Sequence, residues 1–149
     1  MSLQPAIMAA SPDLIWACVG KSSSFIRKSV NMPTMNAEPG NLCGLNSFKY
    51  SGLANTKVIN VSPVIKGKKE SIVLTQGHLK ASRRLRPGTM LVQSGVKKSA
   101  KKAVAAITKT IAGKFYRVDL LDQALVKYNK IKQSFKKRKL VVKSRRAQK

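Results

Sequence analysis

Few side chains in this 149-residue sequence could carry out catalysis. General acid–base and nucleophilic chemistry need a titratable group beside a partner, and the chain offers one histidine, His78, and five scattered carboxylates. The closest pair, Asp119 and Asp122, is better explained by capping at a helix start. The sequence also contains no glycine-rich loop of the type that binds nucleotide phosphates. We therefore predict that the protein is not an enzyme.

Metal binding is not indicated either. Cys18 and Cys43 lie far apart in the sequence, and His78 is near neither of them. A structural zinc site needs about four ligands at suitable spacing. We expect two unpaired thiols that behave as small apolar residues, and neither a metal nor a cofactor. No stretch approaches 18 apolar residues, so we expect no membrane partner. Because no catalytic group is indicated, we also expect no small-molecule substrate.

Phosphate binding is the chemistry that the residue types favour. The chain carries 30 Lys and Arg against 5 Asp and Glu, a formal net charge of +25. Residues 1–65 hold five basic and two acidic residues, whereas residues 66–149 hold 25 basic and three acidic residues. Solvated surfaces usually mix both signs, and a field of one sign attracts polyanions. We infer a basic half that binds nucleic acid through backbone and shape rather than base sequence.

The basic residues form clusters that we predict to contact RNA: one basic turn, one arginine-rich loop, one helix start and a tail. Guanidinium groups in the loop can bind phosphate bidentately. Aromatic residues beside cations, at Tyr50 and in the segment from Phe115 to Arg117, could stack on unpaired bases, although Tyr50 is also a candidate for the core. The predicted RNA-binding set is Lys49, Tyr50, Lys66, Lys68, Lys69, Arg83, Arg84, Arg86, Lys97, Lys98, Lys101, Lys102, Arg117, Lys136, Lys137, Arg138, Lys139, Lys143, Arg145 and Arg146.

The elements that must position these residues indicate an α+β fold, with a small antiparallel β-sheet body, two C-terminal helices and basic extensions. Residues 56–61, ended by Pro63, and residues 71–75, ended by Gly77, are typical of strands. We predict that they pair as an antiparallel hairpin across the basic turn at residues 66–69.

Two helices are predicted in the last third of the chain. Residues 97–112 show apolar residues at helical spacing, with Ser99 as a possible N-cap and Gly113 as the stop. A second helix would begin at Asp119 as its N-cap, with Asp122 as the capping-box partner. Its apolar stripe comprises Leu121, Ala124, Leu125, Tyr128, Ile131 and Phe135.

The remaining segments give weaker patterns. The apolar run at residues 14–19 could form helical turns capped by Asp13 or a buried strand, because periodicity does not separate the two at this length. Residues 24–30 favour a strand. Residues 31–45 are rich in Pro, Asn and Gly and predict a loop, and residues 78–89 form a basic, irregular stretch.

These patterns predict three parts. Residues 1–11 are expected to be a disordered leader, residues 12–135 one domain, and residues 136–149 a basic RNA-binding tail. Within the domain we expect residues 21–76 to be rich in strands and residues 97–135 to be helical.

Five segments together resemble one known family. They read LIW at 14–16, SSF at 23–25, EPGNL at 38–42, NSFKYSGL at 46–53 and YRVDL at 116–120. These segments are similar to the L-twenty-eight-e family of eukaryotic large-subunit ribosomal proteins, which has proline where this chain has valine in the last segment. The octapeptide is the most specific of the five.

The resemblance implies a structural protein of the cytosolic large ribosomal subunit, with a basic C-terminal part on ribosomal RNA. Its implied partners are large-subunit ribosomal RNA and neighbouring ribosomal proteins, and its implied location is the cytoplasmic ribosome after nuclear and nucleolar transit during assembly. A nuclear ribosome-assembly factor shares this domain but is longer and carries acidic tracts. This chain shows neither feature, so we prefer the ribosomal assignment. An assembly factor, or another RNA- or DNA-binding basic protein, is the alternative.

Overall fold

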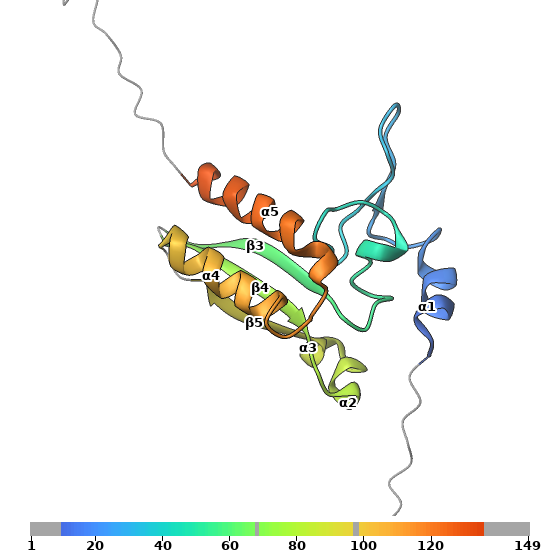
Figure 1. Cartoon of the computed structure of the whole chain (residues 1–149). Helices are drawn as coiled ribbons and strands as arrows, with labels where there is room; N and C mark the ends of the chain where they lie inside the picture. The colour runs from blue at the N-terminus through green and yellow to red at the C-terminus, as the bar shows by residue number, and fades with distance from the viewer. Residues whose placement is uncertain (1–9, 68, 97–98, 136–149) are drawn as a thin grey trace, which may run out of the picture.

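A computed structural model of the chain shows a three-stranded antiparallel sheet beneath two helices (Figure 1). The structure describes residues 10–67, 69–96 and 99–135. The predicted α+β class is confirmed, and none of the helices in those ranges is long and apolar enough to cross a membrane. The elements are α1 (Pro12–Val19), β1 (Ile26–Arg27), β2 (Met35–Asn36), η1 (Phe48–Tyr50), β3 (Ile59–Lys66), β4 (Lys69–Gly77), α2 (Ala81–Arg84), α3 (Pro87–Met90), β5 (Leu91–Val96), α4 (Ala100–Ile111), η2 (Val118–Leu120) and α5 (Leu121–Ser134).

The predicted β-hairpin is present as β3 and β4, which pair in an antiparallel register from Ile59↔Gln76 to Lys66↔Lys69. The predicted end of the first strand at Pro63 is wrong, because β3 continues through it to Lys66. Since β3 is an edge strand in the order β3-β4-β5, a proline without an N–H group can face away from β4 at no cost in hydrogen bonds.

The stretch after β4 is more regular than predicted. It forms two four-residue helices, α2 and α3, which carry no side-chain cap hydrogen bond. The following strand, β5, was not predicted from the sequence, and it pairs antiparallel with β4 from Gly77↔Leu91 to Ile72↔Val96. Its sequence, LVQSGV, contains serine and glycine and alternates weakly. The free edge of β4 supplies the hydrogen bonds that make it a strand.

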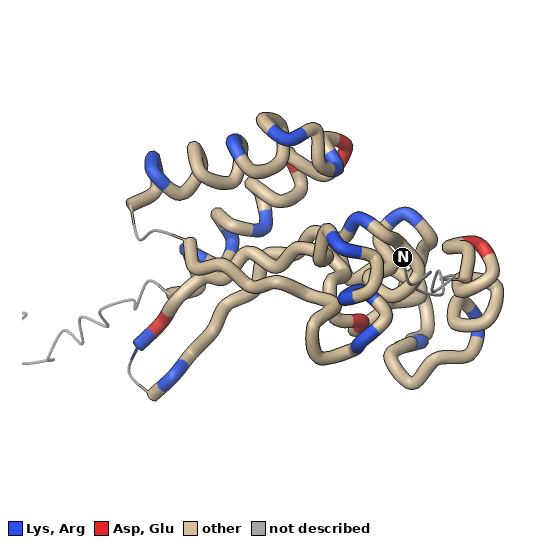
Figure 2. Tube along the Cα trace, turned by 90° about the horizontal axis from the view of Figure 1, so that it is seen from below, with Lys and Arg blue, Asp and Glu red and all other residues tan. Residues whose placement is uncertain are grey.

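Both predicted C-terminal helices are confirmed as α4 and α5, and they lie on the same face of the sheet (Figures 1 and 2). Helix α5 packs on β3 and β4, and α4 packs on β5 and α5. The apolar stripes of both helices face inward. The buried core consists of Leu42, Ile59, Val61, Ile72, Leu74, Ala103, Ile107, Ile111, Tyr116, Leu120, Ala124, Tyr128 and Ile131.

The predicted cap of the second helix is wrong. Helix α5 follows the short 3-10 turn η2, and its N-cap position is Leu120, without a side-chain hydrogen bond. The Asp119 carboxylate is turned to the Arg117 guanidinium instead. Ser99 does occupy the N-cap position of α4, but its hydroxyl makes no capping hydrogen bond.

The N-terminal half is mostly loops that pack beside the sheet (Figure 1). The run that could have been a helix or a strand is helix α1, and its cap is Ser11 rather than Asp13, since the Leu14 N–H donates to Ser11 Oγ at 3.3 Å. The strand predicted over residues 24–30 is only two residues long. It pairs with Met35–Asn36, inside the segment predicted as a loop.

Candidate nucleic-acid interface

The predicted RNA-binding residues that the structure describes are spread over several elements. Lysine and arginine occur at the end of the β3–β4 hairpin, along both large helices and around the loops of the N-terminal half (Figure 2). Part of the predicted set lies outside the described residues: Lys68, Lys97, Lys98, Lys136, Lys137, Arg138, Lys139, Lys143, Arg145 and Arg146. The described members are therefore taken below by their place in the fold.

The end of the β3–β4 hairpin presents two lysines side by side. Lys66 and Lys69 are paired across the hairpin, and both are exposed. Gly67 in the connecting turn has φ +58°, in the left-handed region that favours glycine. The pairing therefore places both lysines at the same end of the hairpin.

The segment comprising α2 and α3 presents two exposed arginines, Arg83 and Arg86. Its backbone is fixed locally, because the Thr89 hydroxyl donates to the Arg83 carbonyl oxygen at 2.8 Å. Arg83 Nη1 lies 3.3 Å from His78 Nε2. Arg84 is half-buried and lines a small, largely apolar cleft under α1, so it is less available than its neighbours.

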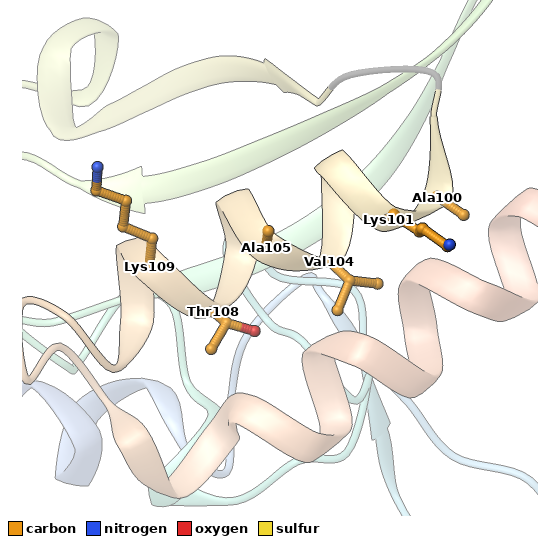
Figure 3. A pocket seen from close by; sticks show the side chains of 6 residues that line it. All are labelled: Ala100, Lys101, Val104, Ala105, Thr108 and Lys109. Atoms are coloured by element: carbon orange, nitrogen blue, oxygen red, sulfur yellow. The ribbon is translucent and has the colours of Figure 1, made fainter.

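Helix α4 presents a shallow surface between two lysines (Figure 3). Lys101 and Lys109 extend from opposite ends of the helix, and the short side chains of Ala105 and Thr108 lie between them. Lys102 is also exposed. A polyanion backbone could approach this helix closely, because no long side chain stands between the two ammonium groups.

Carboxylates neutralise little of this charge within the described ranges. The ion pairs found there both involve Asp119, with Arg117 at 3.0 Å and with Lys49 at 4.0 Å. The cations of the hairpin end, of the α2–α3 segment and of α4 make none of these pairs. Their charge is thus available to an external partner.

Three predicted RNA-binding residues instead join the loops to the start of α5. The Arg117 guanidinium donates to the Lys49 carbonyl oxygen at 2.8 Å, the Lys57 carbonyl oxygen at 3.1 Å and the Asp119 carboxylate. Lys49 Nζ lies 5.7 Å from the centre of the Tyr50 ring. The hydrogen bonds from Arg117 hold the pKa of Asp119 below its usual value.

The side chains of Arg117 and Tyr50 therefore make hydrogen bonds within the protein and are less available to an external partner. The Arg117 side chain is only 16% exposed. The Tyr50 hydroxyl accepts a hydrogen bond from Gln123 Nε2 at 3.0 Å, which fixes the ring against α5. Lys49 remains exposed and is the member of this group that can still reach a phosphate.

Two further polar groups serve the fold and were not identified from the sequence. The Lys127 ammonium donates to the Leu42 carbonyl oxygen and to Asn60 Oδ1, each at 2.7 Å, and burial lowers its pKa. The Tyr116 hydroxyl accepts from the Val58 N–H at 2.9 Å and donates to the Val58 carbonyl oxygen at 3.0 Å, and burial raises its pKa. Their partners are distant in sequence, so no local pattern could reveal them.

Residues 14–134 of the chain match the Ribosomal L28e protein family. The chain belongs to this family. The match covers the sheet, both large helices and the loops of the N-terminal half, and it confirms the family resemblance of the five segments.

One similar protein is large ribosomal subunit protein eL28 of Dictyostelium discoideum. It is 46% identical over 54 residues, which amount to 36% of this chain and 40% of the relative. The alignment thus spans less than half of the relative's length.

The most specific family segments of this L28e chain organise its loops. The buried Glu38 carboxylate accepts hydrogen bonds from Asn36 Nδ2 at 2.6 Å, Ser51 Oγ at 2.7 Å and the Gly52 N–H at 2.9 Å. A Cβ atom at Gly52 would lie 2.0 Å from the Pro39 carbonyl oxygen, so only glycine fits there. These residues fix the body from which the L28e cations project.

Proposed function

We propose that this protein is a structural constituent of the large ribosomal subunit that binds ribosomal RNA through its phosphate backbone. Membership of the L28e family is the observation that carries the proposal. The relative in Dictyostelium is named as a large-subunit protein, which supports the same assignment. Residues 66–149 hold 25 basic and three acidic residues. This positive charge would provide the attraction to RNA phosphates.

The proposed mechanism is charge neutralisation from several sides. Each cation that contacts a phosphate releases condensed counterions, which is a favourable and salt-dependent contribution to binding. Lys66 and Lys69 lie at one end of the sheet, and Arg83 and Arg86 follow its other end. Cations placed in this way favour a protein enclosed between RNA segments over one docked on a single flat face.

We do not expect the described part of this L28e chain to read base edges. Its described cations act through phosphates, and Lys101 and Lys109 frame a helix surface that a backbone can approach (Figure 3). We expect binding to be specific for RNA shape, with position fixed by the surrounding RNA and by neighbouring ribosomal proteins. We place the protein in cytoplasmic ribosomes after nuclear and nucleolar assembly.

Cosedimentation tests this proposal. An epitope-tagged full chain, expressed in eukaryotic cells, is followed through sucrose gradients before and after a high-salt wash. We expect it on mature large subunits and on translating ribosomes, at about one copy per subunit, and resistant to the wash. Confinement to nuclear precursor particles would favour the assembly factor instead, and sedimentation at the top of the gradient would refute both.

A further inference from the structure

Phe115 is displayed on the surface in an unusual way. The chain contains four Phe, three Tyr and one Trp, and Phe115 is the aromatic side chain that is exposed, at 83%, while the others are buried or half-buried. It lies in the turn between α4 and η2. The core therefore does not account for its aromatic ring.

The backbone at Phe115 is held in a conformation that a bulky residue rarely adopts. Its φ is +48°, in the left-handed region, where a side chain costs conformational energy. The turn is fixed on both sides, because the Phe115 N–H donates to the Ala112 carbonyl oxygen at 3.1 Å and the Tyr116 N–H to that of Ile111 at 2.8 Å. The Tyr116 hydroxyl, in turn, is held by the backbone of Val58. An exposed ring on a fixed turn with a strained backbone is typical of a residue that contacts a partner rather than of one that packs in the core.

The surroundings of the turn indicate the kind of partner. Lys114, directly before the ring, is exposed and lines a hollow of about 180 Å³ together with Tyr116, His78, Leu79 and neighbouring residues. No acidic residue lines this hollow, and none occurs in the sequence from Lys80 to Arg117. Lys114 is the sequence neighbour of Phe115 and makes neither of the ion pairs found among the described residues. An exposed aromatic ring next to such a cation in the chain is a combination that binds single-stranded nucleic acid, with the base on the ring and the phosphate on the cation.

We propose that Phe115 stacks on an unpaired base of ribosomal RNA, while Lys114 contacts the adjoining phosphate. This inference rests on the proposed function, because it needs RNA to surround the protein. It adds a base contact to a surface that otherwise binds phosphates. It also explains why phenylalanine occupies a position where glycine or asparagine would adopt the left-handed backbone conformation with less strain.

The test uses large subunits purified from cells whose only copy of the protein carries Phe115→Trp, Phe115→Leu or Phe115→Ala. Ribosomal RNA in these subunits is probed with a reagent that acylates the 2′-hydroxyl of unconstrained nucleotides. We expect at least one unpaired nucleotide to become severalfold more reactive with leucine or alanine, and to stay protected with tryptophan. Leucine is the informative variant, because it keeps apolar bulk but has no π face.

Two results would overturn the inference. The first is protection in the Phe115→Leu subunits equal to that of the native protein, which would indicate insertion into an apolar pocket of a neighbouring protein. The second is an unchanged reactivity profile with every variant. Absence of the native chain from large subunits is a separate outcome, since it refutes the proposed function before any variant is compared.

A stability measurement separates contact from folding. Phe115→Asn places a residue that tolerates the left-handed region at this position, so we expect a melting temperature of the isolated chain equal to or above that of the native protein. The same variant should lose the nucleotide protection. A clearly lower melting temperature would show that Phe115 acts through the fold, and would overturn the assignment.

Discussion

The sharpest prediction concerns Arg83 and Arg86, the two exposed arginines of the α2–α3 segment, which we propose to contact phosphate. Both are exposed and make no ion pair with a described carboxylate. Arg84 between them lines a cleft, so its removal would disturb packing as well as charge. The informative perturbation is therefore the double variant Arg83→Ala/Arg86→Ala, which leaves Arg84 in place.

The expected magnitude follows from counterion release. Each lost phosphate contact reduces the slope of log affinity against log salt by about 0.7 for single-stranded and about 0.9 for duplex nucleic acid. Two contacts therefore reduce the slope by about 1.4 to 1.8. At a salt concentration of about 0.1 M, the larger value corresponds to an affinity roughly 60-fold weaker.

The assay is a salt titration of the full chain binding to ribosomal RNA fragments. The matched control is Lys21→Ala/Lys28→Ala, which removes the same charge from two exposed lysines of the N-terminal half. We expect the control to retain nearly the native slope. The reasoning is refuted if the arginine variant keeps the native slope, or if both variants lose it equally, because the latter would make net charge alone responsible.

Three further predictions concern the fold that carries these cations. Tyr116→Phe leaves the buried Val58 N–H without an acceptor, whereas the Val58 carbonyl keeps its bond from the Gly77 N–H, and it should cost about 2 kcal/mol in urea unfolding. Because the folded pKa of Tyr116 is raised by burial, its contribution is present below about pH 10 and is lost as the pH rises through the folded pKa. The variant should lack this dependence. Glu38→Ala removes the acceptor of three hydrogen bonds and should lower the free energy of unfolding in urea by about 3 kcal/mol or more. Glu38→Gln should lower it by less in the same assay. Asp119→Asn should cost less than about 1 kcal/mol at pH 7, because the pair is partly exposed. The hydrogen bonds from Arg117 lower the folded pKa of Asp119, so thermal melts should show the difference vanishing as the pH falls through that lowered pKa.

Elements whose stabilising contacts are local could be predicted from the sequence. The β3–β4 hairpin has strand formers on both sides of a short basic turn. Helices α4 and α5 show apolar residues at helical spacing, and those residues are buried or partly buried against the core. In each case the pattern that predicts the element also forms its buried face.

Elements that depend on distant partners could not be predicted. Strand β5 has little strand propensity of its own and forms on the free edge of β4. Pro63 predicts the end of a strand by its residue type, whereas its place on an edge strand lets β3 continue through it. Asp119 has the sequence position of a helix cap, yet a guanidinium two residues away competes for its carboxylate.

The candidate interface divides in the same way. The prediction that the basic half binds a polyanion rests on the sequence alone, because net charge does not depend on how the chain folds. Which cations are available was decided by tertiary structure. Arg117 and the Lys49 carbonyl are 68 positions apart in sequence, and the hydrogen bond between them joins two distant segments of the fold. The Arg117 side chain, which the sequence predicts to bind phosphate, therefore stabilises the fold. Phe115 lies two positions before Arg117. Its ring is nevertheless exposed, because it stands on a fixed turn whose backbone is in the left-handed region.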